Sequence, residues 1–162
     1  MAAGLMVLTL LISLSLGKKE KKQASPNINL RDKGCSMNQV YTKTVVHMEE
    51  VPVVHSRGGQ MRVLASPATV GSTQLIMGHV LLQPGEEIKE HLHDYGEENV
   101  YVVRGRGTAF IEDIPHAIRE NSLFIARKGE RHRVVNEGPG ELELVFATAP
   151  LAPRPEIGHR EV

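Results

Sequence analysis

The fold is decided by the stretch Gly85-Glu-Glu-Ile-Lys-Glu-His91-Leu-His93-Asp-Tyr-Gly-Glu-Glu98-Asn-Val100-Tyr-Val-Val-Arg-Gly105. Successive side chains of a β-strand point to opposite faces, so His91 and His93, two positions apart, share a face. The same alternation places Glu98 on the face of Val100. The apolar residues mark this face as the interior, so three polar side chains are expected to point inward.

A second stretch, Gly129-Glu-Arg-His132-Arg-Val134-Val-Asn136, repeats this pattern further along the chain. Alternation puts His132 on the same face as Val134 and Asn136. If the two stretches are neighbours in space, all four candidate ligands face one interior. A buried polar group costs free energy unless it is hydrogen-bonded or holds an ion, so the four positions require an explanation.

The residue types suit a catalytic metal. Neutral imidazoles and one carboxylate bind divalent Zn, Fe, Mn, Ni or Cu, and three histidines with one glutamate leave positions open for water or substrate. The spacing of the first stretch leaves one ambiguity. Glu97 competes with Glu98, and the alternation with Val100 favours Glu98.

The amino-acid composition argues against some classes of binding partner. The chain has 162 residues, 19 Lys and Arg against 19 Asp and Glu, and a formal net charge of zero. Nucleic acids and anionic membranes usually bind proteins with a basic excess, so we expect a small-molecule partner instead. The single cysteine, Cys35, excludes an internal disulfide and a cysteine-based zinc cluster.

Strand and turn signals alternate along most of the chain. Short β-branched or alternating runs are separated by Gly, Pro, Asn and Asp, and no long helical period is present. The expected strands are 40–47, 61–65, 73–77, 79–83, 99–104, 108–112, 116–119, 122–127, 131–136 and 142–148. About ten short strands predict an all-β fold, a small barrel or a double-sheet jelly roll.

A barrel of this size has a pocket at its mouth, and some inward positions should line it. His79 and Gln83 share parity, and if their face is the inner one they line the pocket without binding metal. The full set of residues expected to form the substrate pocket is Gln83, Tyr95, Val100, Val102, Asn136 and Phe146. His159, in the C-terminal tail, has no predicted role.

The two quoted stretches resemble the two motifs of the cupin superfamily, over about residues 60–150. The resemblance implies a single cupin β-barrel, a double-stranded β-helix, with one divalent metal held by His91, His93, Glu98 and His132. Two positions depart from the family pattern. Asn121 stands where the second motif usually begins with Gly, and Asn tolerates a positive φ better than other non-glycine residues. Arg127 replaces a usual Pro and removes no ligand.

The tail segment 149–159, the segment 62–71 and the first quoted stretch are similar to the small single-domain cupins of aromatic polyketide biosynthesis. That resemblance implies a cyclase that promotes intramolecular aldol cyclisation of a poly-β-ketone. Metal-bound hydroxide, Glu98 or His79 could move the proton. Two alternatives stay open: a dioxygenase that uses Fe, Ni or Cu with O₂, and a barrel that binds a small ligand without turnover.

The chain is expected to have three parts: residues 1–36 as an apolar segment with a flexible linker, residues 37–150 as the cupin domain, and residues 151–162 as a Pro-rich tail. The apolar run of residues 5–16 is too short for a membrane-spanning helix. If it is an upstream extension, the protein is cytoplasmic, whereas a signal or an uncleaved anchor would make it secreted or membrane-attached. We also expect a homodimer, with residues 40–47 crossing to the second copy.

Overall fold

The computed structural model describes residues 43–162, which form two antiparallel five-stranded sheets. Sheet A contains, in spatial order, β1 (Gln60–Ala65), β2 (Ile76–Leu82), β9 (Leu142–Ala149), β4 (Glu97–Arg104) and β7 (Leu123–Ala126). Sheet B contains β10 (Arg160–Glu161), β3 (Glu87–Leu92), β8 (His132–Val135), β5 (Arg106–Ile111) and β6 (Ile114–Arg119). Two short 3₁₀ helices, η1 (Met48–Glu50) and η2 (Pro155–Ile157), complete the described elements.

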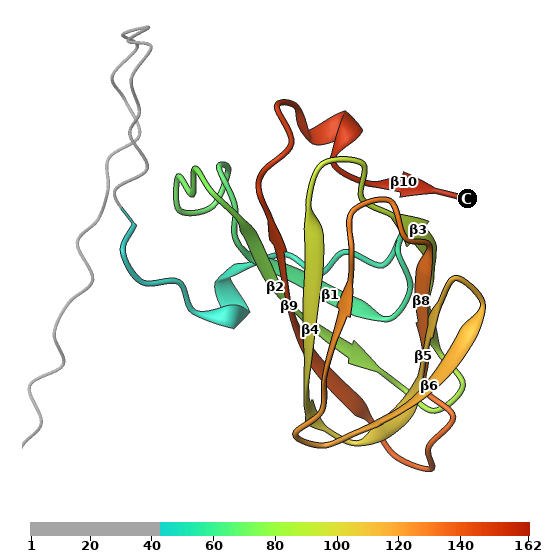
Figure 1. The fold of residues 1–162 in the computed structure, drawn as a ribbon. Coiled ribbons are helices and arrows are strands. Elements are labelled where there is room, and N and C mark those ends of the chain that lie inside the picture. Colours follow the sequence, from blue (N-terminus) through green and yellow to red (C-terminus); the bar gives the residue numbers. More distant parts are fainter. Residues whose placement is uncertain (1–42) are drawn as a thin grey trace, which may run out of the picture. The chain divides into compact units, whose positions relative to one another are not determined.

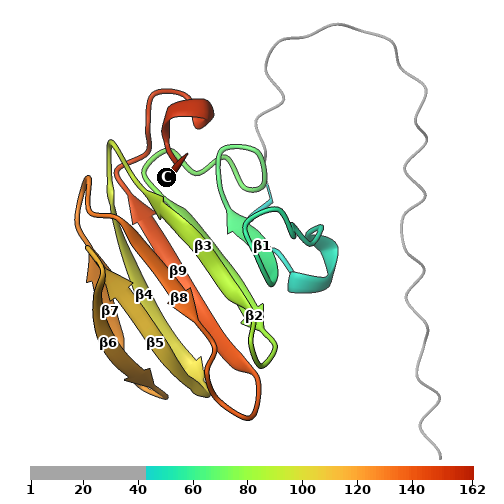
Figure 2. The same ribbon diagram turned by 90° about the vertical axis from the view of Figure 1, so that its right-hand side faces the viewer.

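The chain passes back and forth between the two sheets. From β2 onward it enters β3 in sheet B, returns to β4 in sheet A, and later alternates again through β7, β8 and β9. Figure 1 shows β2, β9 and β4 on one side of the barrel and β3, β8 and β5 on the other, and Figure 2 shows the same strands from the side. This arrangement is a double-stranded β-helix, or jelly roll, and it confirms the predicted fold class.

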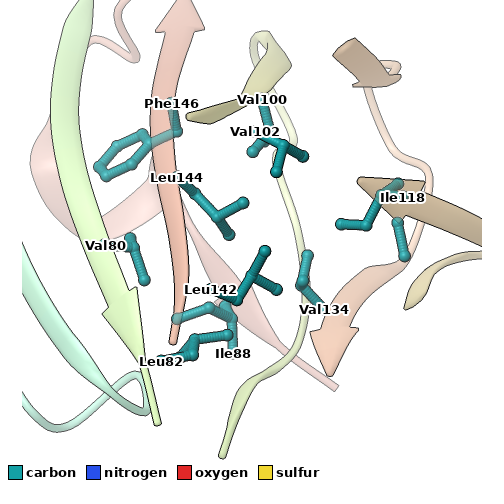
Figure 3. Close-up of a cluster of buried hydrophobic side chains, with 11 residues drawn as sticks. Val80, Leu82, Ile88, Val100, Val102, Ile118, Val134, Leu142, Leu144 and Phe146 are labelled. Carbon is teal, nitrogen blue, oxygen red and sulfur yellow. The ribbon is translucent and has the colours of Figure 1, made fainter. Parts of the chain in front are cut away.

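The core lies between the sheets and follows the predicted alternation. Alternate side chains are buried over residues 98–102 of β4 and 142–146 of β9, and the inward Val80 and Leu82 of β2 and Val134 of β8 are buried as well. Figure 3 shows these apolar side chains meeting between the two layers. The buried cluster comprises Val80, Leu82, Ile88, Val100, Val102, Ala109, Ile118, Val134, Leu142, Leu144 and Phe146.

The order of inward residues separates a dry end of the barrel from a polar end. On β4 the inward series begins with Glu98 and continues with Val100, and on β8 it begins with His132 and continues with Val134. The antiparallel partner β9 brings Thr148 opposite Glu98 and Phe146 opposite Val100. The polar side chains therefore gather at one end, and the apolar side chains close the other.

Two predicted strands are a single strand. The sequence predicts separate strands at residues 73–77 and 79–83, since glycine often marks a turn, but β2 runs unbroken from Ile76 to Leu82. A Cβ at Gly78 would lie 2.5 Å from the Phe146 ring and 2.6 Å from the Arg62 carbonyl oxygen. Gly78 therefore makes room for an aromatic ring inside the strand.

The structure tests only part of what the sequence predicts for the N-terminal region. Residues 1–42, which include the apolar segment, the linker and the start of the predicted 40–47 strand, lie outside the described residues. Residues 43–47 are described and are not part of a strand, so that prediction is wrong for them. Within residues 43–162, no helix is long and apolar enough to cross a membrane.

Asn121, which stands where the cupin motif usually has Gly, has a positive φ as predicted. Asn121 adopts a φ of 65° in the turn between β6 and β7, the left-handed region that glycine usually supplies. Its side-chain Oδ1 accepts a hydrogen bond from the Tyr101 hydroxyl at 2.6 Å. The turn is thus preserved without a glycine.

Candidate metal centre

The polar end of the barrel brings together four side chains, His91, His93, Glu98 and His132, all of them buried. One ligand atom from each lies within 4.8 Å of every other. The Glu98 carboxylate is 3.1 Å from His132 Nε2, 3.5 Å from His93 Nε2 and 3.9 Å from His91 Nε2. These are the four residues that the spacing and the cupin resemblance indicated.

The pairing of β3 with β8 places two of the histidines directly opposite each other. His91 is the register partner of His132, and a β-bulge lies between Ile88 and His91. Without that extra residue, Ile88 and His91, three positions apart, could not both point inward. Both are buried, so the bulge is what turns His91 to the interior.

The remaining two candidate ligands lie in the β3–β4 connection and at the start of β4. His93 follows the last residue of β3, and Gly96 lets the loop pass close to β9, where a Cβ would lie 2.7 Å from the Ala149 carbonyl oxygen. The loop then enters β4, where Glu98 is buried and Glu97 is exposed. Since only Glu98 faces the histidines, the alternation decides between the two glutamates as predicted.

Each of the three histidines has its Nδ1 beside a backbone carbonyl. His91 Nδ1 is 2.8 Å from Lys89 O, His132 Nδ1 is 3.1 Å from Glu130 O, and His93 Nδ1 is 2.8 Å from Gly158 O. A carbonyl oxygen can only accept, so Nδ1 carries the proton in every case. In the neutral ring, Nε2 then presents a free lone pair, and all three Nε2 atoms point toward Glu98.

This arrangement of charge fits a cation. Three lone pairs facing a carboxylate repel one another unless protons or a metal ion lie between them. Among the described residues, His93 Nε2 is one of the buried side-chain nitrogens that lack a hydrogen-bond partner. Buried polar atoms are rarely left without a partner, so the residues present fit a bound divalent ion.

The surroundings of His91 and Glu98 favour the forms that bind a metal, a neutral imidazole and an ionised carboxylate. Burial, followed by the neighbouring His132, lowers the pKa of His91 to about 4, so that ring is neutral. Burial opposes the ionised form of Glu98, but the facing His132 and His93 rings outweigh it and hold the pKa of Glu98 well below its usual value. For His93, burial is outweighed by Glu98, which raises the pKa.

Two contributors to the site were missed by the sequence analysis. Thr148 Oγ1 donates a 3.0 Å hydrogen bond to Glu98 Oε1, and it occupies the inward position beyond Phe146 on β9. Continuing the β9 alternation by one step would have found it. His159 stacks on His91, with ring centroids 4.4 Å apart and ring planes 22° apart. No signal in the tail sequence could have placed it there.

A cavity of about 500 Å³ opens beside the cluster and is lined by three of its members, His91, His93 and Glu98. Its walls are mainly apolar and include the predicted pocket residues Tyr95 and Phe146. Val100, Val102 and Asn136 do not line it, contrary to prediction, because they lie deeper in the barrel than the polar end. Val100 and Val102 are core residues, and Asn136 is fully buried.

The predictions for His79 and Gln83 are also wrong. On β2 the inward residues are Val80 and Leu82, so His79 points to the outer face of sheet A. There its Nε2 lies 2.9 Å from the Glu143 carboxylate, and Gln83 Nε2 donates to Glu141 Oε1 at 3.0 Å. Neither residue reaches the cavity, so His79 cannot move a proton at the candidate metal centre.

Comparison with known families and proteins gives consistent matches. A family model described as a cupin domain matches residues 78–148. Protein SchB of Streptomyces halstedii is 44% identical over 115 residues, which cover 71% of this chain and 83% of that protein. Polyketide synthase CurC of Streptomyces cyaneus is 41% identical, with coverage of 71% and 75%. Tetracenomycin polyketide synthase protein TcmJ of Streptomyces glaucescens is 37% identical, with coverage of 70% and 76%.

Solved structures share the architecture. The polyketide cyclase RemF of Streptomyces resistomycificus superimposes with a TM-score of 0.59 at 17% identity, covering 74% of this chain and 85% of that one. Pac13, described as a nucleoside dehydratase, superimposes with a TM-score of 0.62 at 20% identity, covering 75% and 92%. Identities this low show a shared fold.

Proposed function

This chain belongs to the cupin family, and on that premise we propose that it is a metal-dependent enzyme of polyketide biosynthesis that promotes intramolecular aldol cyclisation of a poly-β-ketone. The names of two relatives with 41% and 37% identity support the pathway, because both are described as polyketide synthase proteins. The observation that carries the proposal is the cluster of four buried candidate ligands, three of which line an apolar cavity.

The ligand side chains would hold one divalent ion, for which Zn, Fe, Mn and Ni remain candidates. When bound, such an ion supplies Lewis-acid polarisation of a substrate carbonyl. The chain itself contributes the geometry. The three backbone carbonyls keep the Nε2 lone pairs aimed at one point, and Thr148 orients the Glu98 carboxylate.

The cavity walls would fold the substrate and exclude water. Ile76, Ile88, Phe146 and Leu151 present apolar surface close to the ligands. A flexible poly-β-ketone confined against these walls loses conformations that separate its reacting carbons, and this ordering is a large part of what an enzyme can contribute to a cyclisation. Burial also prevents competing reactions with bulk water.

The decisive experiment measures metal and product together. The purified protein is analysed for metal content and is then added to the poly-β-ketone made by a minimal aromatic polyketide synthase, with products followed by mass spectrometry. We expect one bound ion per chain and a changed distribution of cyclised products. His91→Ala should remove both, whereas Glu97→Gln, an exposed neighbour of the ligand set, should keep both. An unchanged product distribution from metal-free His91→Ala would refute the proposal.

Oxygen uptake separates the cyclase from a dioxygenase with the same ligands. Aldol cyclisation with loss of water is redox-neutral, so we expect no O₂ consumption during turnover. Stoichiometric O₂ consumption would favour the oxygenase instead. Tight binding of the polyketide without any change in its product pattern would indicate a non-catalytic binding protein.

A further inference from the structure

The C-terminal strap, residues 150–161, reaches across the polar end of the barrel. It leaves β9 in sheet A, passes through η2, and ends as β10 beside β3 in sheet B, as Figure 1 shows in dark red. The register pairs Arg160 with Leu92 and Glu161 with His91. The strap therefore joins the strand that carries one of the metal ligands.

The strap contacts two of the four candidate ligands. The Gly158 carbonyl accepts the hydrogen bond from His93 Nδ1 at 2.8 Å, and the His159 ring stacks on His91. The other two histidines obtain their carbonyl partners locally, His91 from Lys89 and His132 from Glu130, each only two residues earlier. Of the three rings, only His93 depends on a residue 65 positions away for its tautomer.

Several contacts hold the strap in place. At its start, Leu151 N donates to Gln74 O at 3.0 Å. At its end, the Arg160 guanidinium makes two 3.1 Å hydrogen bonds to the Asp94 carboxylate, next to His93 in sequence. The strap also lines the cavity through Leu151 and His159. An ordered strap thus closes one side of the centre.

We propose that the C-terminal strap positions the metal ligands: the Gly158 carbonyl sets the tautomer of His93, and the His159 ring sets the plane of His91. This inference rests on the proposed metal centre. Because the strap contacts two of the side chains that would hold the ion, strap docking and metal binding stabilise each other. Such coupling is reciprocal, so metal must order the strap by the same free energy by which the strap tightens metal binding.

Metal affinity is the first readout. Metal-free protein is titrated with Co²⁺ in competition with a chelator, and the visible d–d bands report the coordination geometry. Ending the chain after Ile157 removes the His93 acceptor, His159 and β10 together, and we expect affinity to fall roughly 10–100-fold, the usual cost of losing a group that orients a ligand. Deleting Val162 alone is the matched control and should leave affinity and spectrum unchanged.

Two point variants separate stacking from ligation. His159→Phe keeps a flat ring against His91 but has no nitrogen, so we expect it to retain the Co²⁺ spectrum and nearly full affinity. His159→Ala removes the ring and should weaken binding and broaden the bands. If His159→Phe loses metal as completely as His91→Ala does, then His159 is a ligand and the positioning role is overturned.

Hydrogen exchange on the unaltered chain tests whether metal binding orders the strap, and it requires no truncation. We expect Zn²⁺ to slow amide exchange in residues 151–161, and we expect no such change in His132→Ala. Unchanged exchange on metal binding, or equal Co²⁺ affinity with and without residues 158–162, would overturn the inference and leave the metal centre standing. Failure of the full chain to bind any divalent ion would instead refute the proposed function.

Discussion

At the scale of single residues, Glu98 determines the charge of the candidate metal centre. Within residues 43–162 it is the one carboxylate that faces the three Nε2 atoms, and its orientation is supported by Thr148. Its sequence neighbour Glu97 has the same chemistry but is exposed on the opposite face of β4. This adjacent pair allows a test in which chemistry is constant and only orientation differs.

Glu98→Gln should weaken divalent metal binding by more than the roughly 10–100-fold that changes in supporting groups cost, because it removes the only anionic ligand. Glu97→Gln should bind metal as the unaltered chain does. Competition titration with a chromophoric chelator measures both. Equal loss in the two variants would mean that Glu97, or the general charge of the loop, contributes to the site.

Asn136 has a structural role that is separate from the site. Its Nδ2 donates to Leu82 O and Gly140 O, both at 2.9 Å, and its Oδ1 accepts from Gly138 N at 3.0 Å. Asn136→Ala removes the side-chain partner of two buried backbone groups, Leu82 O and Gly138 N, so we expect a loss of about 3 kcal/mol in the free energy of unfolding. Urea denaturation measures this loss. Metal affinity of the folded variant should be unchanged, since Asn136 lies outside the cavity.

At the scale of elements, β2 shows how a glycine can be required inside a strand. The inner face of β2 passes under the Phe146 ring, and only Gly78 leaves space for it. The strand continues on both sides with inward Ile76 and Val80, in register with β9. The close packing of these strands forms one wall of the cavity.

Gly78→Ala should destabilise the fold by about 1–3 kcal/mol, as overpacking of a core does, because the Arg62 carbonyl on the neighbouring strand cannot move aside freely. The matched control is Gly140→Ala. At Gly140 no atom lies within 4 Å of the added carbon, and we expect a change within about 0.5 kcal/mol. Chemical denaturation compares the two; equal stabilities would show that Phe146 relaxes without cost.

At the scale of the described barrel, metal binding and folding are linked. The ligands come from β3, the β3–β4 loop, β4 and β8, so a bound ion connects both sheets, and the unfolded chain has no such site. Zn²⁺ at about 100 times its dissociation constant should add roughly 2.7 kcal/mol to the free energy of unfolding. Calorimetry should show a higher melting temperature with Zn²⁺, reversed by EDTA and absent in His132→Ala.

A homodimer remains a prediction, now with a candidate surface. The outer face of sheet A exposes Tyr101 and Val103 of β4, together with Leu123 of β7, the register partner of Tyr101. Apolar residues clustered on an exposed sheet face are typical of an interface. Light scattering should report twice the chain mass, and Leu123→Lys should lower it. A monomeric unaltered chain would contradict the prediction.

The sequence by itself determined the all-β fold, most strand positions and the four candidate ligands. Alternation is a local property of a strand, so Glu98 could be chosen over Glu97, and His132 placed inward, from neighbours one or two residues away. The positive φ of Asn121 was also predicted, because the cupin resemblance places this Asn where the motif usually has Gly.

Only the tertiary structure decided which inward positions face the cavity, because that depends on depth along the barrel and on the opposite sheet. Val100 and Asn136 have the correct parity and lie too deep, and His79 lies on the outer face because Val80 and Leu82 are the residues of β2 that point inward. The largest difference is the strap. His159 is 68 residues from the ligand on which it stacks, and contacts over such distances arise only when the sheets assemble.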